Sequence, residues 1–295
     1  YYTHPSGSNY NYSQGLSLGD SMNLMISYDN DKNLVHYFGK RRVYGMPYVL
    51  SEWNSCEPNQ YAAGDMMYMN AYSAMNNWTP INFAFLQGYR NKSNRLSFVF
   101  NSSESPVKMA MQRASTQLLL RGDVSEAEYG YYAPATKSQA LDTEFEQEIP
   151  SGLPMIAKSG IMWADLEKTK PNPQNSYSQI KKLAEQADGV YVSATGELKT
   201  DTKSKLFEIN TPKSQGFSGI LEGRTVELEN IDFRSDNHFA AVILTALDDE
   251  AIANSGHMLL TATARNRNTD QEFSNDGTLM KKGGTAPILM EPVLG

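Results

Sequence analysis

The residue with the clearest chemical potential is Glu52, a carboxylate that directly follows a short apolar run. Tyr48, Val49 and Leu50 are strand-forming residues, and the polar pair Ser51 and Glu52 comes where a buried strand would leave the core. A side chain at the carboxyl end of a parallel strand is held rigidly and faces a cleft lined by loops. A carboxylate there can act as a nucleophile, or as a general acid or base. The alternative is that Glu52 is an ordinary solvated loop residue.

Two strand–helix units are expected to position this carboxylate. Apolar residues at three- and four-residue steps predict one or two helices over residues 17–38, before the strand. Residues 61–78, which are rich in Ala and Met, predict a helix after it, and residues 81–86 predict a second strand. A further helix is predicted to start at Ser105-Pro106 and to end at Gly122, because Pro suits a first helical turn and Gly a helix end.

The second half of the chain has a different pattern. Short alternating runs separated by turn residues predict strands at about ten-residue spacing, preceded by a surface helix over residues 175–187. Such a series is typical of an antiparallel β-sandwich. We therefore predict an α/β part over residues 1–130 and a β-sandwich over residues 131–295. The predicted strands are 189–193, 206–209, 217–221, 225–228, 239–244 and 258–263.

Composition narrows the classes of partner. The chain has 295 residues and a net charge of -7, without a block of Lys and Arg, which argues against a nucleic-acid surface. No apolar run is long enough to span a bilayer. Cys56 is the only cysteine and the four histidines lack the spacing of a zinc site, so we expect neither a metal nor an organic cofactor. The Asp- and Asn-containing turn at residues 232–237 lacks the spacing of a calcium loop.

The segment around Glu52 resembles a known enzyme family. Ser51-Glu52-Trp53-Asn54, then Pro58-Asn59-Gln60-Tyr61, a helix, and residues 78–85 resemble the last two strand–helix units of retaining glycoside hydrolases of the clan A (β/α)8-barrel superfamily. The resemblance implies the C-terminal portion of a TIM barrel followed by a β-sandwich. It also implies a poly- or oligosaccharide substrate, Glu52 as the nucleophile, and a secreted, periplasmic or cell-surface location.

The resemblance suggests further sugar contacts. An aromatic and His-Pro segment lines the cleft in these families, which makes Tyr2 and His4 candidates, although a frayed terminus explains them equally well. Trp53 would form the floor of a subsite and Asn54 would orient Glu52 or a hydroxyl. Adjacent residues of an extended segment point in opposite directions, so only one of these two need face the cleft. Gln87 is a candidate by its position after the second strand.

Half of the expected active site is missing from the sequence. Retaining hydrolysis needs two carboxyl groups about 5–5.5 Å apart. In clan A the acid/base follows an Asn, and the chain contains no Asn-Glu pair. Only two strand–helix units precede the sandwich, whereas eight close a barrel. Since the chain also begins at Tyr1, we expect a processed or partial product, inactive without a second polypeptide or N-terminal fragment that completes the barrel.

Two other functions fit the same residues. One is a non-catalytic carbohydrate-binding or adhesion protein that uses the β-sandwich, with Glu52 as a bystander. The other is a degenerate barrel that binds glycans without cleaving them. The triplet Arg121-Gly122-Asp123 adds little to an adhesion function, because a glycine that ends a helix explains it. A second carboxylate at the retaining separation from Glu52 would favour the enzyme.

Overall fold

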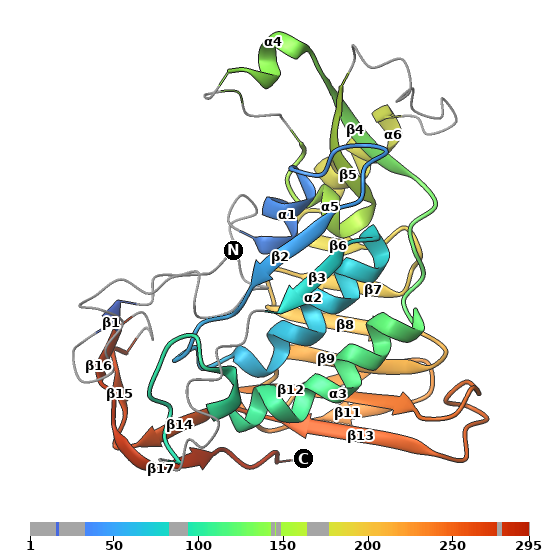
Figure 1. Cartoon of the computed structure of the whole chain (residues 1–295). Coiled ribbons are helices and arrows are strands. Elements are labelled where there is room, and N and C mark those ends of the chain that lie inside the picture. Colours follow the sequence, from blue (N-terminus) through green and yellow to red (C-terminus); the bar gives the residue numbers. More distant parts are fainter. Residues whose placement is uncertain are drawn as a thin grey trace.

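A six-stranded antiparallel sheet forms the largest part of the fold (Figure 1). Its strand order is β13-β12-β9-β8-β7-β6. The sheet consists of β6 (Val190–Val192), β7 (Leu198–Asp201), β8 (Leu206–Asn210), β9 (Ser214–Ile220), β12 (Phe239–Ala246) and β13 (Met258–Thr263). The computed structural model describes residues 16–17, 33–82, 94–142, 145, 149–163, 177–275 and 279–294.

Five of the six strands predicted from alternation are members of this sheet, and their antiparallel pairing is confirmed. The sixth, predicted at residues 225–228, forms β10 (Thr225–Glu227) in a separate hairpin with β11 (Asp232–Arg234). Strand β7 was not predicted from the sequence. Its Thr200 is buried and its hydroxyl lies 2.6 Å from that of Tyr72, so a polar residue occupies a core position where alternation calls for an apolar one.

Two long helices, α2 (Ala62–Asn76) and α3 (Pro106–Arg121), lie side by side over one face of the sheet (Figure 1). Both were predicted. The α3 helix starts at its proline and is followed by Gly122 at φ 70°, a left-handed conformation that glycine adopts without a steric penalty. The α2 helix is followed by Asn77 at φ 56°, the other residue type that commonly closes helices in this way.

The main core fills the space between these helices and the sheet. The Phe207 ring of β8 meets the rings of Tyr68 and Tyr72 of α2, with centroids 4.9 and 5.6 Å apart. The opposite face of the sheet has a smaller core under the β10–β11 hairpin, where Phe217 and Phe233 lie 5.4 Å apart. One sheet is thus covered by helices on one side and by a hairpin on the other. The two-sheet sandwich stays a prediction, as does the division at residue 130.

Two pairs of parallel strands lie beside this layered core. Strands β2 (Val49–Trp53) and β3 (Thr79–Asn82) pair in parallel with α2 between them in the chain, which confirms the predicted strand–helix–strand unit. Strands β4 (Gly130–Ala135) and β5 (Lys158–Trp163) form a second parallel pair that was not predicted. Within the described ranges the parallel strands form these separate pairs, and the barrel stays a prediction.

Shorter elements complete the fold. Helix α6 (Tyr177–Gln186) confirms the predicted surface helix, and α1 (Leu34–Gly39) is the described end of the region predicted as helical before β2. None of the helices in the described ranges is long and apolar enough to cross a membrane. The other elements are α4 (Lys137–Ala140), α5 (Leu153–Ile156), the 3₁₀ turn Ser102–Glu104, β1 (Leu16–Ser17), β14 (Asn266–Thr269), β15 (Glu272–Phe273), β16 (Leu279–Lys282) and β17 (Thr285–Met290).

Candidate functional site

Glu52 lies at the carboxyl end of β2, where the pairing with β3 is irregular. Leu50 pairs with Pro80 and Trp53 pairs with Asn82, so β2 advances three residues while β3 advances two. The extra residue is a β-bulge, and it leaves Glu52 and the residue before it exposed between two buried neighbours. Bulges re-aim side chains and are over-represented beside active sites. Glu52 is therefore held by a strand and turned toward solvent.

A buried polar cluster follows Glu52 in the loop between β2 and α2. At its centre is Lys108 of α3, which is only 5% exposed. Its ammonium group lies 3.5 Å from Oε1 of Glu57 and donates to Oδ1 of Asn54 at 3.4 Å and to the carbonyl of Ser55. One buried cation thus holds three points of a single loop. The loop cluster is defined as Asn54, Ser55, Glu57, Asn59, Asp65 and Lys108.

Asp65, in the first turn of α2, is the second carboxyl group of the loop cluster. Nδ2 of Asn59 lies 3.0 Å from Oδ2 of Asp65 and 2.6 Å from Oγ of Ser55, and it donates to both. Burial raises the pKa of Asp65 to about 7, against the lowering effect of the Ser55 hydrogen bond and of Lys108, while Glu57 raises it further. Lys108 is therefore paired with Glu57 and lowers the pKa of Asp65 only through its nearby charge, so the pKa of Asp65 stays near neutral pH.

The cysteine inside this loop is not a nucleophile at neutral pH. Cys56 is fully buried, and burial raises the pKa of its thiol to about 12 despite the nearby ammonium of Lys108. A thiol reacts through its thiolate, which is scarce under these conditions. Among the described residues, no group of three or more His, Cys, Asp or Glu side chains is arranged to hold a metal ion.

The two residues predicted to flank Glu52 in a sugar site have structural surroundings. Trp53 is 1% exposed and its ring belongs to the main core, so it presents no face to solvent in this structure. The amide of Asn54 donates to the carbonyl of Phe100 at 3.4 Å and to Oγ of Ser102 at 3.3 Å. Their roles as sugar contacts stay predictions. The other predicted contacts, Tyr2, His4 and Gln87, lie outside the described residues.

Sequence reasoning missed the charged members of the loop cluster. Asp65 and Lys108 each stand in a helix that was predicted without regard to its charged residues, and Glu57 stands in a loop that was recognised only by its turn residues. The available signal was Asp65 itself, a carboxylate in an Ala- and Met-rich helix in which nearly every residue is buried. A charge in such a helix needs a partner, because an unpaired buried charge is strongly unfavourable.

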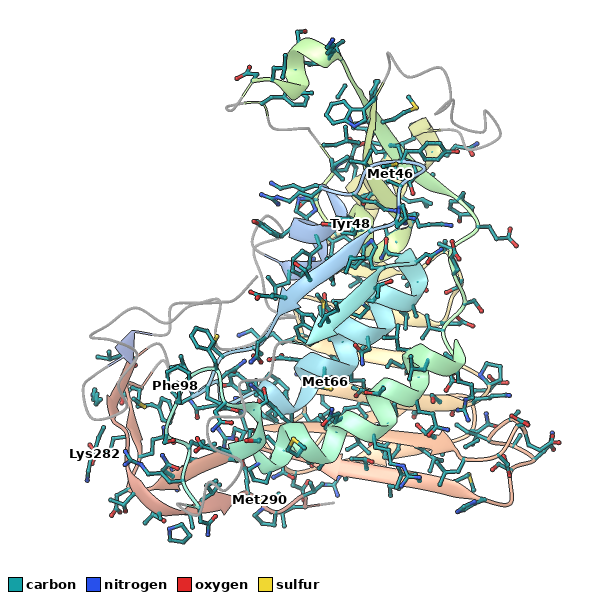
Figure 2. The ribbon with its side chains drawn as sticks, in the orientation of Figure 1. Met46, Tyr48, Met66, Phe98, Lys282 and Met290 are labelled. Carbon is teal, nitrogen blue, oxygen red and sulfur yellow. The ribbon has the colours of Figure 1, made fainter. Side chains whose placement is uncertain are left out.

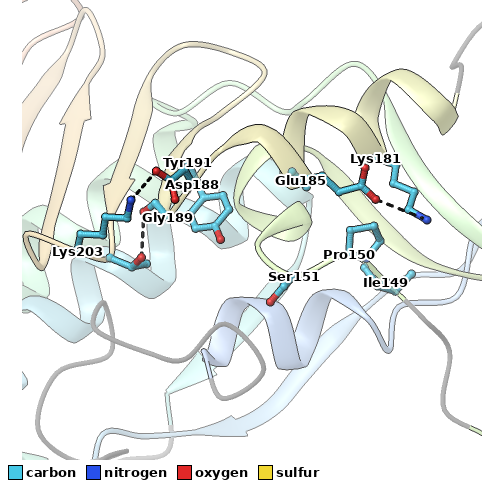
Figure 3. A pocket seen from close by; sticks show the side chains of 11 residues that line it. Ile149, Pro150, Ser151, Lys181, Glu185, Asp188, Gly189, Tyr191 and Lys203 are labelled. Carbon is cyan, nitrogen blue, oxygen red and sulfur yellow. Dashed lines mark hydrogen bonds and ion pairs between the residues drawn. The ribbon is translucent and has the colours of Figure 1, made fainter.

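A cavity of about 510 Å³ lies away from Glu52, between α6 and the turn that connects β7 with β8 (Figure 3). Ion pairs stand at its rim, with Lys203 2.6 Å from Asp188 and Lys181 3.7 Å from Glu185. These side chains are exposed and their charges cancel in pairs, so the cavity offers no net charge to a ligand. It is a weaker candidate site than the end of β2.

Comparisons with protein-family models, with curated proteins and with solved structures found no match to this chain. What the site can do is therefore judged from its own groups. These are an exposed carboxylate on a bulged strand end and, directly after it, a loop fixed by a buried ion pair.

Proposed function

We propose that this chain supplies the nucleophile of a retaining glycoside hydrolase that cleaves O-glycosyl bonds of a poly- or oligosaccharide. The observation that carries the proposal is the exposed Glu52 on the bulge at the carboxyl end of a parallel strand. Its carboxylate would attack the anomeric carbon while a second carboxyl group protonates the leaving oxygen. That second group would then take a proton from the water that hydrolyses the glycosyl ester.

The loop cluster supports this role by fixing the chain directly after Glu52. A nucleophile must be held close to its productive geometry by neighbours that are themselves locked. Lys108 binds Asn54 and Ser55, two and three residues beyond Glu52, and its own position on α3 is set by the packing of that helix. The chain that follows the end of β2 is thereby bonded to α3.

We also propose that β2 and β3 belong to a (β/α)8 barrel that a second polypeptide or an N-terminal part completes, with a β-sandwich following. Val49 and Ile81, one from each strand, are each 49% exposed. Parallel sheets are normally covered on both faces, so these side chains suit burial against further strands. The completing part would carry the acid/base about 5–5.5 Å from Glu52. A secreted, periplasmic or cell-surface location belongs to the same proposal.

The test is turnover of aryl glycosides by the purified chain together with any polypeptide that accompanies it. We expect Glu52→Gln to lower turnover at least about 100-fold, and the matched control Glu128→Gln, an exposed carboxylate before β4, to leave it unchanged. A 2-fluoro glycoside should add its glycosyl mass to the peptide that contains Glu52. Full activity of Glu52→Gln, or labelling elsewhere, would refute the assignment.

A non-catalytic carbohydrate-binding or adhesion protein is the second candidate. The observation in its favour is that Trp53 is buried and that the amide of Asn54 bonds to protein groups, so the neighbours of Glu52 serve the fold. Glycan binding without turnover, unchanged by Glu52→Gln, would select this class.

A further inference from the structure

A second cavity, of about 560 Å³, opens between the loop that follows β2 and the β14–β17 pair. Gln60 lines it from the loop, Asn266 and Arg267 from β14, and Met290 from β17. Figure 2 shows Met290 at the lower edge of the molecule. The volume is within the range of small-molecule sites and is sufficient for one or two sugar rings.

The charges around this cavity do not cancel. Nε of Arg265 lies 2.7 Å from Oε2 of Glu291, and Oε1 of Glu291 accepts from Nδ2 of Asn237 at 3.2 Å. The Glu291 carboxylate is therefore paired with the guanidinium group of Arg265. Arg267 is exposed and forms no ion pair within the described part of the chain. The cavity keeps one uncompensated guanidinium in a chain whose net charge is -7.

Asn266 fixes the β14 wall of the cavity. It is 5% exposed, and its Nδ2 donates to Oγ of Ser105 at 3.1 Å, which ties β14 to the start of α3. Leu289 and Met290, both partly exposed, add apolar surface that suits the face of a sugar ring.

We propose that this cavity is a subsite for a saccharide that carries a carboxylate or sulfate group. Arg267 would bind the anionic group, because a guanidinium matches carboxylate and sulfate oxygens with two parallel hydrogen bonds. Gln60, on the loop that follows β2, would bind a hydroxyl group of the same saccharide. The ligand class is thus an acidic oligosaccharide, either a uronic acid polymer or a sulfated one.

The cavity is physically connected to Glu52. Asn266 bonds to Ser105, the residue that precedes α3, and Lys108 one turn later holds Asn54 just beyond Glu52. Gln60 stands at the other end of the same loop. A saccharide bound here would thus contact the loop that follows the proposed nucleophile. This step, which makes an acidic polysaccharide the substrate, rests on the proposed function, whereas the binding itself does not.

The test is binding to the full chain, with any accompanying polypeptide, by isothermal titration calorimetry. The probes are an oligogalacturonate, a sulfated galactan oligosaccharide and a neutral galactan oligosaccharide of equal length. We expect one of the two acidic probes to bind at least 10-fold more tightly than the neutral one, which also identifies the anionic group. Arg267→Gln should weaken that probe about 10-fold. Arg113→Gln, which removes the same charge from an exposed position on α3, should leave the binding of that probe unchanged.

Equal binding of acidic and neutral probes, or equal effects of Arg267→Gln and Arg113→Gln, would overturn the subsite. Binding is measured in the Glu52→Gln background as well, where it should be unchanged. Loss of turnover on Glu52→Gln without a preference for acidic probes would leave the hydrolase standing and remove the subsite. Preference for an acidic probe together with full turnover by Glu52→Gln would support the subsite and refute the assignment of Glu52 as the nucleophile.

Discussion

The loop cluster predicts an unusual pH dependence of stability, which Asp65→Asn would remove. Burial raises the pKa of Asp65 to about 7 in the folded protein, whereas the ordinary value of 3.8 applies to the unfolded chain. Below pH 3.8 both states hold the proton. Between these values the unfolded chain releases the proton and the folded chain keeps it, so the folded state loses stability as the pH rises toward 7. Above about 7 the loss is complete.

The magnitude follows from the two pKa values. They differ by about 3, and each pKa unit corresponds to 1.36 kcal/mol, so Asp65 lowers the free energy of unfolding by about 4 kcal/mol between pH 4 and pH 8. Three other carboxyl groups shift in the opposite direction. Burial alone would raise the pKa of Glu126, Asp201 and Glu291, but hydrogen bonds from neighbouring groups outweigh it, so each pKa lies below its ordinary value.

The assay is thermal and urea unfolding between pH 5 and pH 8.5. We expect wild-type protein to lose stability across this range and Asp65→Asn to show a much flatter profile, with the variant about 4 kcal/mol more stable at pH 8.5. At roughly 2 °C per kcal/mol, this is a difference in Tm of about 8 °C. Asp232→Asn, at an exposed position on β11, should follow the wild type. Parallel profiles of wild type and Asp65→Asn would refute the reasoning.

Two further substitutions test the packing around the sites. Lys108→Met should lower the free energy of unfolding by about 3–5 kcal/mol in urea titrations, because it leaves Glu57 buried without its cation; adding Glu57→Gln should restore at least half of the loss. Gly152→Ala should cost at least about 1 kcal/mol more than Gly196→Ala. Both glycines have left-handed φ values, 76° and 74°, but a Cβ on Gly152 would lie 2.0 Å from Cε1 of Tyr191 while Gly196 has open space. Equal costs would show that the Tyr191 ring moves aside.

Local signals were sufficient for much of the fold. The start and end of α3 follow from a proline and a glycine, whose effects depend only on the backbone at those positions. The strands β8 and β12 were visible because nearly all of their buried positions are filled by apolar residues. In each case the residues that decide the structure are neighbours in the sequence.

Non-local pairing was not predictable in the same way. Strand β4 contains Pro134, which argues against a strand because proline cannot donate to a ladder, and its partner β5 begins 23 residues after Ala135. Parallel strands also need long connections that leave no local signature. At Gly160 the carbonyl of Arg42 lies so close that a Cβ would meet it at 2.1 Å, so this strand also depends on a segment more than 100 residues earlier.

The candidate site also has a part that local sequence predicts and a part that depends on non-local pairing. Glu52 could be proposed from sequence because it directly follows its strand, whereas the bulge that exposes it exists only in the pairing with β3. The loop cluster depends on α3 lying against α2, which brings Lys108 to residues about 50 positions away. Replacing a buried ion pair with apolar groups is often neutral or stabilising, so stability alone gives little reason for Lys108 to be there. Its contacts with Asn54, Ser55 and Glu57 instead hold one conformation of the loop beside Glu52, which is what a positioned nucleophile requires.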